Sequence, residues 1–526
     1  MADSSQTALE KAIALSTTAQ LEAIQSPSRQ LAIVASAGSG KTRVLTLRTA
    51  YRASEGSLDP SKTLVATFSR KAADELRHRL FRLGVRDLTC GTIHSVALRL
   101  LNDQRSALSR PPVELLIDRS RVIAQALQSN GVSGVSAAAI ETEIGWAKAR
   151  LLDPASYEAV AQTSGRQAPM ARGQLAQVFS TYETLKRQQG RLDLDDLLGH
   201  ATTLLATNEQ FSAAVAWRFH HVALDETQDL NPAQLALILA ICGNDPDLTF
   251  VGDPNQSIYG WNGSDASLMA DLTNRFPKAQ TIYLRSNKRS SRHIVDTANA
   301  ALGAAGLVSE AADRGSAPTV TRYPTDDDEA QAIALQLWRN EFPAEALSGV
   351  AILARTNAQL QVLANALDKA AVPYKFAGAD LAPASDLRSH VKVMAVDEGS
   401  EDLDRVTLST FHRSKGLEWK TVYVIGVADG LVPYKMARTH EALAEEQRLF
   451  YVALTRATDD LHLSWAERSS RLGSETRRRG PSRWLQPIEQ HLAQRATEDA
   501  PLEKTSRLER LQAIRRSITP SPPRAS

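Results

Sequence analysis

A glycine-rich octapeptide constrains this chain more than any other feature, because it joins an apolar run to a helical pattern. Residues 35–42 read ASAGSGKT; the apolar run LAIVA leads into them and the helical segment VLTLRTA follows. Gly38 and Gly40 let the backbone turn so that its amides can surround phosphate groups. Lys41 can place its ammonium on the β- and γ-phosphates, and Thr42 can offer a hydroxyl to Mg²⁺. A chance Gly/Ser-rich turn would lack this strand-to-helix context, so we predict a phosphate-binding loop. Its residues are Ala35, Ser36, Ala37, Gly38, Ser39, Gly40, Lys41 and Thr42.

Two adjacent carboxylates follow another apolar strand-like run, in HHVALDETQD. Asp225 can hold Mg²⁺ directly or through water, and Glu226 can orient or deprotonate an attacking water molecule. A solvated acidic loop is the alternative, but the phosphate-binding loop upstream favours hydrolysis. We therefore predict an ATPase whose Mg²⁺ is held by Thr42, Asp225 and Glu226.

Strand-like runs followed by helical segments occur twice along the chain, first in residues 28–100 with 220–275 and again in 280–465. This alternation predicts an α/β fold with doubly wound parallel sheets. Residues 101–200 read as almost purely helical, which indicates a helical insertion in the first α/β domain.

The same patterns predict an order of domains. The first α/β domain takes residues 1–100 and 191–278, and the helical insertion takes residues 101–190. The second α/β domain takes residues 279–485. Residues 486–526 are polar and basic and end in TPSPPRAS, so we predict a disordered tail.

Composition limits the possible partners. The formal net charge is only +2, so nucleic-acid binding would depend on a local patch. Cys90 and Cys242 are too few for a zinc cluster or a disulfide framework. The N-terminus lacks the order of a signal peptide, and no apolar stretch approaches the roughly 20 residues that span a bilayer. We expect a cytoplasmic protein with no membrane partner.

Several motifs follow one another in a fixed order: TAQLEAI, TFSRKAADELRHR, GTIHS, DETQD, VGDPNQSIYGW, TLSTFHRSKGLEWKTVYV and EEQRLFYVALTRA. Over about residues 16–485 the chain resembles the UvrD/Rep/PcrA helicases of superfamily 1. The stretches IGWAKARLLDPASYEA and DLDDLLGHA are most similar to the second UvrD-like helicase of actinobacteria. The resemblance implies two RecA-like domains (1A and 2A), a helical insertion (1B), ATP and Mg²⁺ as cofactors, and single-stranded or tailed DNA as partner. It also implies 3′-to-5′ polarity and work in DNA repair or replication maintenance at the bacterial nucleoid.

The resemblance implies further residues of the nucleotide site. Gln20 would read adenine, and Gln256 would sense the γ-phosphate. Arg289 and Arg456 would reach the phosphates from the second α/β domain, a recurrent device in phosphoryl transfer. From the residues alone, a surface ion pair is the favoured interpretation for each of the two arginines. The remaining expected nucleotide contacts are Arg43 and Glu418.

The resemblance also implies a strand-binding set. Aromatic side chains beside basic residues can stack on bases, worth about 1–3 kcal/mol per base. Tyr259 and Trp261 lie in a Gly/Asn-rich loop, which favours this role, whereas Phe68 follows an apolar strand and could equally pack in the core. The expected DNA contacts are Phe68, Thr92, His94, Tyr259, Trp261, His412 and Lys415.

Three departures from the family pattern affect the expected activity. Lys288 stands where the family's NYRS motif has a tyrosine, so adenine stacking should be weaker. Asn262 stands where the family has an arginine, so coupling between nucleotide and DNA should be weaker. Only 26 residues, 379–404, separate Gly378 from Arg405, where relatives carry a helical subdomain called 2B.

Three functions follow from these patterns. The leading hypothesis is an ATP-driven single-stranded DNA translocase and 3′-to-5′ helicase. The second is a translocase that remodels protein–DNA complexes but unwinds weakly without a protein partner, which the short linker and Asn262 favour. The third is a non-catalytic DNA-binding paralogue, against which the retained polar residues of the nucleotide site argue.

Overall fold

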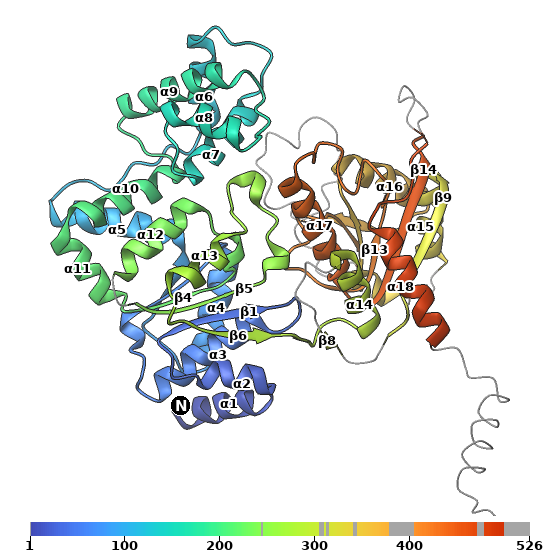
Figure 1. Cartoon of the computed structure of the whole chain (residues 1–526), viewed down its shortest axis with the longest axis horizontal. Helices are drawn as coiled ribbons and strands as arrows, with labels where there is room; N and C mark the ends of the chain where they lie inside the picture. Colours follow the sequence, from blue (N-terminus) through green and yellow to red (C-terminus); the bar gives the residue numbers. More distant parts are fainter. Residues whose placement is uncertain are drawn as a thin grey trace, which may run out of the picture.

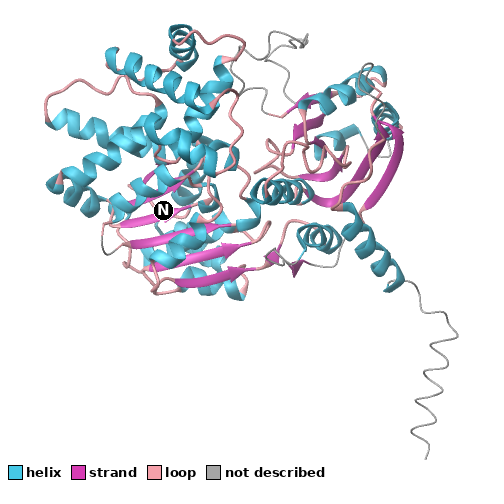
Figure 2. Cartoon of the chain, turned by 45° about the horizontal axis from the view of Figure 1, so that its top comes forward, coloured by secondary structure: helices cyan, strands magenta, loops and turns pink. Residues whose placement is uncertain are grey.

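Two α/β bodies, each built on a six-stranded parallel sheet, make up most of the chain (Figure 1). The computed structural model describes residues 2–243, 246–303, 310–311, 315–339, 344–377, 404–470 and 478–498. The predicted α/β fold with parallel sheets is confirmed. Figure 2 shows the two sheets as separate bodies with helices packed around them. Within these residues, no helix is both long enough and apolar enough to cross a membrane.

The first sheet has the strand order β3-β2-β4-β5-β1-β6. Its strands are β1 (Gln30–Ala35), β2 (Thr63–Thr67), β3 (Thr89–Thr92), β4 (His221–Leu224), β5 (Asp247–Gly252) and β6 (Gln280–Leu284). One face is covered by α1 (Ala2–Ala14), α2 (Thr18–Gln25), α3 (Lys41–Ser54) and α4 (Arg70–Arg82). The other face is covered by α5 (Ile93–Ala107), α10 (Leu194–Thr207), α11 (Glu209–Arg218), α12 (Pro232–Cys242) and α13 (Leu268–Arg275). Because both faces are covered, the strands are continuous apolar runs.

The edge strand β6 corrects one predicted boundary. It pairs in parallel with β1, with Leu31 opposite Gln280 and Ala35 opposite Leu284. The first α/β body therefore extends beyond residue 278, where we expected the second domain to begin. The local alternation of strands and helices identifies a strand but does not show which sheet takes it.

The predicted helical insertion forms a small body of its own, at the top of Figure 1. Its helices are α6 (Arg119–Ser129), α7 (Ala137–Ala149), α8 (Pro154–Thr163) and α9 (Arg172–Gln188). They enclose a separate core that includes Ile123, Ile144 and Phe179. Buried charges join this body to α10, because the Lys148 ammonium lies 2.6 Å from a carboxylate oxygen of Asp193 and 2.6 Å from one of Asp196.

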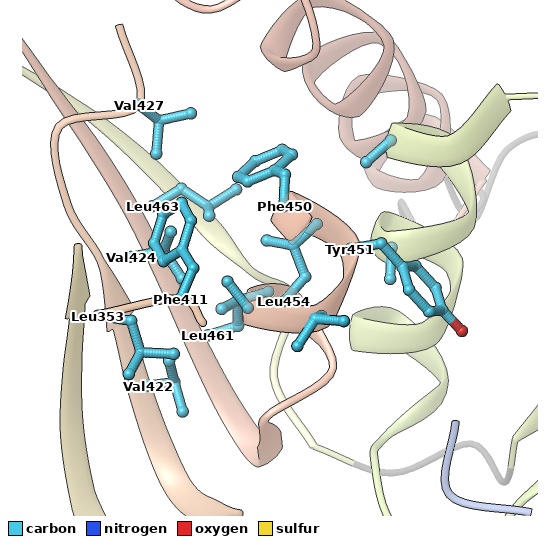
Figure 3. Packing of buried hydrophobic residues seen from close by; sticks show 14 of the residues in the cluster. Leu353, Phe411, Val422, Val424, Val427, Phe450, Tyr451, Leu454, Leu461 and Leu463 are labelled. Atoms are coloured by element: carbon cyan, nitrogen blue, oxygen red, sulfur yellow. The ribbon is translucent and has the colours of Figure 1, made fainter. Parts of the chain in front are cut away.

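The second sheet has the order β11-β12-β10-β13-β14-β9. Its strands are β9 (Thr319–Thr325), β10 (Val350–Ala354), β11 (Tyr374–Phe376), β12 (Val406–Thr410), β13 (Trp419–Val424) and β14 (Ala457–Arg468). One face is covered by α15 (Asp326–Trp338) and α16 (Asn357–Lys369), and the other by α14 (Arg292–Leu302), α17 (His440–Leu454) and α18 (Leu485–Glu498). In Figure 3, Phe450 and Leu454 of α17 lie over Leu353, Val424 and Leu461 of the sheet. A short pair, β7 (Ser286–Asn287) and β8 (Glu310–Ala311), lies between the two bodies along the chain.

The linker expected in place of the 2B subdomain, residues 379–404, lies outside the described residues except for Asp404. The strands on either side of it, β11 and β12, are parallel neighbours, with Tyr374 opposite Val406.

The predicted disordered tail is partly wrong, because its first residues form α18. Leu485 and Ile488 are fully buried and Leu492 packs beside them, so one stripe of the helix faces the second core. The spacing of these apolar residues, three and four apart, is that of one helical face, which the polar composition obscured. Residues 499–526 lie outside the described part of the chain.

Replacing Ile488 by alanine should therefore lower the free energy of unfolding by about 2–5 kcal/mol, the usual cost of truncating a buried aliphatic side chain. Glu489→Ala, one residue along on the exposed face, is the matched control and should change it little. Urea unfolding followed by circular dichroism measures both variants. Equal midpoints for Ile488→Ala and the unmodified chain would mean that α18 does not contribute to the stable core.

Candidate nucleotide and single-strand binding site

The phosphate-binding loop connects the carboxyl end of β1 to the first residue of α3. Gly38 and Gly40 have φ angles of 70° and 83°, in the left-handed region that glycine adopts without strain. A side chain at Gly38 would also collide with the Asn287 amide. The loop amides and the N-terminus of α3 form the kind of site that binds phosphate groups. The predicted loop thus has the geometry that its motif requires.

The predicted metal ligands lie beside this loop, at the carboxyl end of β4. The Thr42 hydroxyl donates to Asp225 Oδ2 over 2.9 Å, and Glu226 follows in a left-handed backbone conformation with φ 52°. Burial, with the neighbouring charge of Glu226, raises the pKa of Asp225. Burial also acts to raise the pKa of Glu226, but the charges of Lys41 and Lys415 outweigh it and hold that pKa below its usual range. A hydroxyl and two carboxylates are oxygen ligands of the type that Mg²⁺ prefers, so the residues fit this ion.

The carboxyl end of β5 brings a third group of side chains to the same place. Lys41 Nζ lies 3.7 Å from Asp253 Oδ2, and Gln256 Nε2 donates to the same oxygen over 2.7 Å. Gln256 belongs to the 3₁₀ turn η3 (Pro254–Gln256), directly after the strand. Ends of parallel strands are the usual place for ligands in such sheets, and here three strands bring the predicted phosphate-contacting residues together.

The two predicted arginines face this cluster from the second α/β body. Arg289 forms an ion pair with Glu418, which is itself an expected nucleotide contact. Arg456 is only 1% exposed and donates to the carbonyls of Val452 and Leu417. Burial and the charge of Arg289 lower the pKa of Arg456 to about 9. The charge of Arg456 also helps to lower the pKa of Glu226, after the larger effects of Lys41 and Lys415.

The expected adenine end lies where α1 and α2 meet the phosphate-binding loop. Gln20 Oε1 accepts from the Thr17 amide over 3.0 Å, and Gln20 Nε2 donates to the Ser39 carbonyl over 2.8 Å. Arg43 donates to the Ala12 carbonyl over 2.6 Å. The Lys288 ammonium donates to the carbonyl of Leu15 over 3.2 Å, so a cation lies beside this end of the site.

Replacing Lys288 by tyrosine should lower the KM for ATP about three- to tenfold relative to GTP, because a ring can stack on a purine as the ammonium cannot. Lys288→Leu, which removes the charge without adding a ring, should not produce this gain. Steady-state hydrolysis of both nucleotides measures the effect, and an unchanged ATP/GTP preference in Lys288→Tyr would contradict it.

Four of the residues predicted to contact single-stranded DNA form an aromatic row that crosses from the first α/β body to the second: Phe68, Tyr259, Trp261 and His412. The rings of Phe68 and Tyr259 stack at 5.3 Å and 10°, and Trp261 meets His412 edge to face at 6.5 Å. Phe68 is 41% and Trp261 46% exposed, so both keep surface for a base. Burial lowers the pKa of His412 to about 4, with a contribution from Arg355, so its ring is neutral near pH 7 and suits stacking.

Thr92 and His94 lie at the carboxyl end of β3. Thr92 caps α5, and its hydroxyl accepts from the Ser95 amide over 3.2 Å. Burial lowers the pKa of His94. These two side chains come from the same edge of the first sheet as Phe68, which follows β2.

Lys415, the last of the predicted DNA contacts, lies on the second α/β body and contacts residues of the first. Its ammonium lies 2.7 and 2.6 Å from the two carboxylate oxygens of Asp229 and 2.7 Å from the Gln256 carbonyl. It also lies 4.9 Å from the centre of the Tyr259 ring. The ammonium is therefore engaged by protein groups next to the aromatic row.

Sequence reasoning missed the partners that hold the loop between Gln256 and Trp261. Arg448 Nε donates to the Ser257 carbonyl over 2.7 Å, and Glu445 Oε1 accepts from the Gly260 amide over 3.0 Å. Both come from α17, in the string EEQRLFYVALTRA. The sequence marks these two residues only by their place in this motif, because the residues around them do not indicate what they contact.

Two family models and several known proteins match this chain. The model of the UvrD/REP helicase N-terminal domain matches residues 16–277, and that of the UvrD-like helicase C-terminal domain matches residues 282–380 and 387–468. The ATP-dependent DNA helicase UvrD2 of Mycobacterium tuberculosis H37Rv is 30% identical, over 89% of this chain and 81% of its own length. UvrD1 of the same strain is 29% identical, over 84% and 62%. PcrA of Leuconostoc citreum is 32% identical, over 68% and 49%.

Proposed function

The chain belongs to the UvrD/REP family of ATP-dependent DNA helicases, and we propose that it couples ATP hydrolysis to 3′-to-5′ movement along single-stranded DNA. One observation carries the proposal. The loop that bears Gln256 at the nucleotide site continues directly into Tyr259 and Trp261 of the aromatic row. A change at the γ-phosphate can therefore reach the bases through a few residues. We infer that this motor works in DNA repair or replication maintenance in the bacterial cytoplasm.

The nucleotide site supports in-line attack of water on the γ-phosphate. Glu226 would orient the water and take its proton, while Lys41 and the loop amides hold the phosphates. Thr42 and Asp225, with Glu226 beside them, would form the site for Mg²⁺, which would supply charge neutralisation at the β- and γ-phosphates. Arg289 and Arg456 would stabilise the charge that develops during transfer, and they can do so only while the second α/β body is closed on the first.

Closure and reopening of this interface would move the strand. In the second body, Lys415 donates to the Gln256 carbonyl of the first body, and Arg448 donates to the Ser257 carbonyl. Loss of the γ-phosphate would change the contacts of Gln256 and, with them, the position of the aromatic row. Alternate gripping of the bases by the two bodies then gives a step for each hydrolysed ATP.

Steady-state ATP hydrolysis with and without single-stranded DNA tests the proposal. We expect turnover that requires Mg²⁺ and rises with oligothymidylate, and that rises much less with blunt duplex of equal mass. Turnover that is indifferent to DNA would contradict the proposed coupling, and absence of turnover under all conditions would favour a non-catalytic DNA-binding protein.

The short linker between Gly378 and Arg405 favours a second function, in which the motor clears proteins from DNA and unwinds poorly. Each base-pair step costs about 1.4 kcal/mol on average, and the 2B subdomain that we expect in relatives would help to engage the duplex. We predict that isolated monomers translocate on a 3′ single-stranded tail but release the adjoining duplex only briefly, unless a protein partner assists. Single-turnover unwinding, compared with translocation on the same tail, measures this. Sustained unwinding of long duplexes by monomers would show that the missing part is not needed.

A further inference from the structure

The peptide groups on either side of Trp261 are held by side chains from two different parts of the molecule. The Glu445 carboxylate, on α17 of the second α/β body, accepts from the amides of Gly260 and Trp261. Arg166, in the helical insertion, donates through Nη2 to the Trp261 carbonyl over 3.1 Å. The indole itself is 46% exposed and has an edge contact with His412. The backbone on both sides of Trp261 is therefore held by these two side chains.

Glu445 is tied to the second body. It lies on the same helix as Leu449 and Phe450, which are buried in the core against the sheet (Figure 3 shows Phe450). The contact with the turn η4 (Gly260–Asn262) is close, because a side chain at Gly260 would collide with the Glu445 carboxylate. A displacement of α17 relative to the first body would therefore change the contact between Glu445 and the amides before Trp261.

Arg166 is tied to the insertion just as firmly. Its Nε donates to Glu143 Oε2 over 3.0 Å, and its guanidinium lies 4.8 Å from the centre of the Trp146 ring. Glu143 is buried and also accepts from the Tyr157 hydroxyl over 2.8 Å. These contacts fix the guanidinium relative to α7 and α8. The Trp261 carbonyl, which accepts from this guanidinium, should therefore move together with the helical insertion.

The same insertion also supports the turn that follows Trp261. Gly263 has a φ angle of 90°, and a side chain there would collide with the Ala149 methyl group and approach the Trp146 carbonyl. The turn is thus packed directly onto the end of α7. The insertion, the second body and the loop of the first body all meet at Trp261.

We propose that Glu445 and Arg166 are positioning residues for Trp261, which set the angle at which its indole meets a base and make that angle depend on domain closure. This deepens the proposed function, on which it rests. While both Glu445 and Arg166 hold the backbone around Trp261, the indole faces a base of the bound DNA strand. When the second body moves away after hydrolysis, Glu445 moves with it while Arg166 remains, so the peptide tilts and the base is released.

A double-mutant cycle distinguishes this role from a general effect on folding. The measured quantity is the oligothymidylate concentration that gives half-maximal stimulation of ATP hydrolysis. Glu445→Ala, Arg166→Ala and Trp261→Ala should each raise it, by about tenfold for the loss of a charge-assisted hydrogen bond. In the Trp261→Ala background, neither Glu445→Ala nor Arg166→Ala should raise it further, because both act through the indole. Glu441→Ala on α17 and Arg121→Ala in the insertion are exposed controls that should leave it unchanged.

Effects that multiply in the double variants would overturn the assignment, since Glu445 and Arg166 would then act independently of Trp261. If Glu445→Ala does not fold, Glu445→Gln keeps the volume, removes the charge and enters the same cycle. The outcome is separate from that of the proposed function. An unmodified protein that DNA does not stimulate would overturn the proposed function itself, whereas multiplicative effects in a stimulated enzyme overturn only the role of the two positioning residues.

Discussion

Replacing Glu226 by glutamine should lower the DNA-stimulated kcat about a thousandfold, the scale on which a positioned general base contributes to catalysis, while ATP still binds. Glutamine has nearly the same shape, and its carbonyl oxygen can keep the bond that Glu226 accepts from Gln228. It cannot take a proton from water. Loss of the negative charge also removes repulsion between Glu226 and the buried Asp225, so nucleotide binding should not weaken.

Single-turnover hydrolysis and binding of a fluorescent ATP analogue measure the two parts of this prediction separately. Glu209→Gln, an exposed change at the first turn of α11, is the matched control for loss of one carboxylate. Wild-type turnover in Glu226→Gln would mean that another group activates the water. Loss of binding together with turnover would mean that Glu226 mainly shapes the site.

Replacing Lys41 by alanine should lower kcat/KM for ATP by about 10²–10³-fold or more, since it removes a cation from the phosphates. Binding of ATP should also weaken, because of the charges around Lys41. Lys41 is the cation within 3.7 Å of Asp253, which is fully buried, and its charge also acts on Asp225 and Glu226. Without this ammonium, the buried carboxylates of Asp225 and Asp253 and the half-buried carboxylate of Glu226 would face an incoming triphosphate.

The control for Lys41→Ala is Lys11→Ala, which removes an exposed ammonium from α1. Calorimetric titration with ATP and Mg²⁺ should show weakened binding only for Lys41→Ala. Intact affinity with lost turnover would mean that Lys41 acts in the transition state alone. Intact affinity with intact turnover would contradict the assignment of the loop.

Local sequence was enough to predict which residues cluster at the phosphate-binding loop. A buried strand, two glycines, a lysine and a helix occur within a short stretch, and the Asp225–Glu226 pair directly follows another buried strand. In parallel sheets such strand ends share one edge, so their side chains were expected to meet, and Thr42 does donate to Asp225. The two parallel sheets were predictable as well, because the alternation of strands and helices that produces them is visible along the sequence.

Contacts between distant segments were not predictable in this way. Nothing near Lys415 in the sequence indicates that its ammonium binds Asp229, nor does α17 reveal that Glu445 holds the amide of Gly260. The strand β6 and the helix α18 were misplaced for a related reason. Edge strands carry no local mark of the sheet they join, and a helix buried along one stripe has a polar average composition.

Movement of the protein along single strands of different length tests whether ATP hydrolysis drives 3′-to-5′ translocation. A stopped-flow assay would follow a fluorophore at the 5′ end of oligothymidylates, after ATP and Mg²⁺ are added to bound protein with a trap for released molecules. We expect a lag before the signal that grows in proportion to strand length, no such lag with the fluorophore at the 3′ end, and no directed signal from Glu226→Gln. A lag that does not depend on length, in a protein whose ATPase is active, would contradict the claim that hydrolysis drives 3′-to-5′ movement.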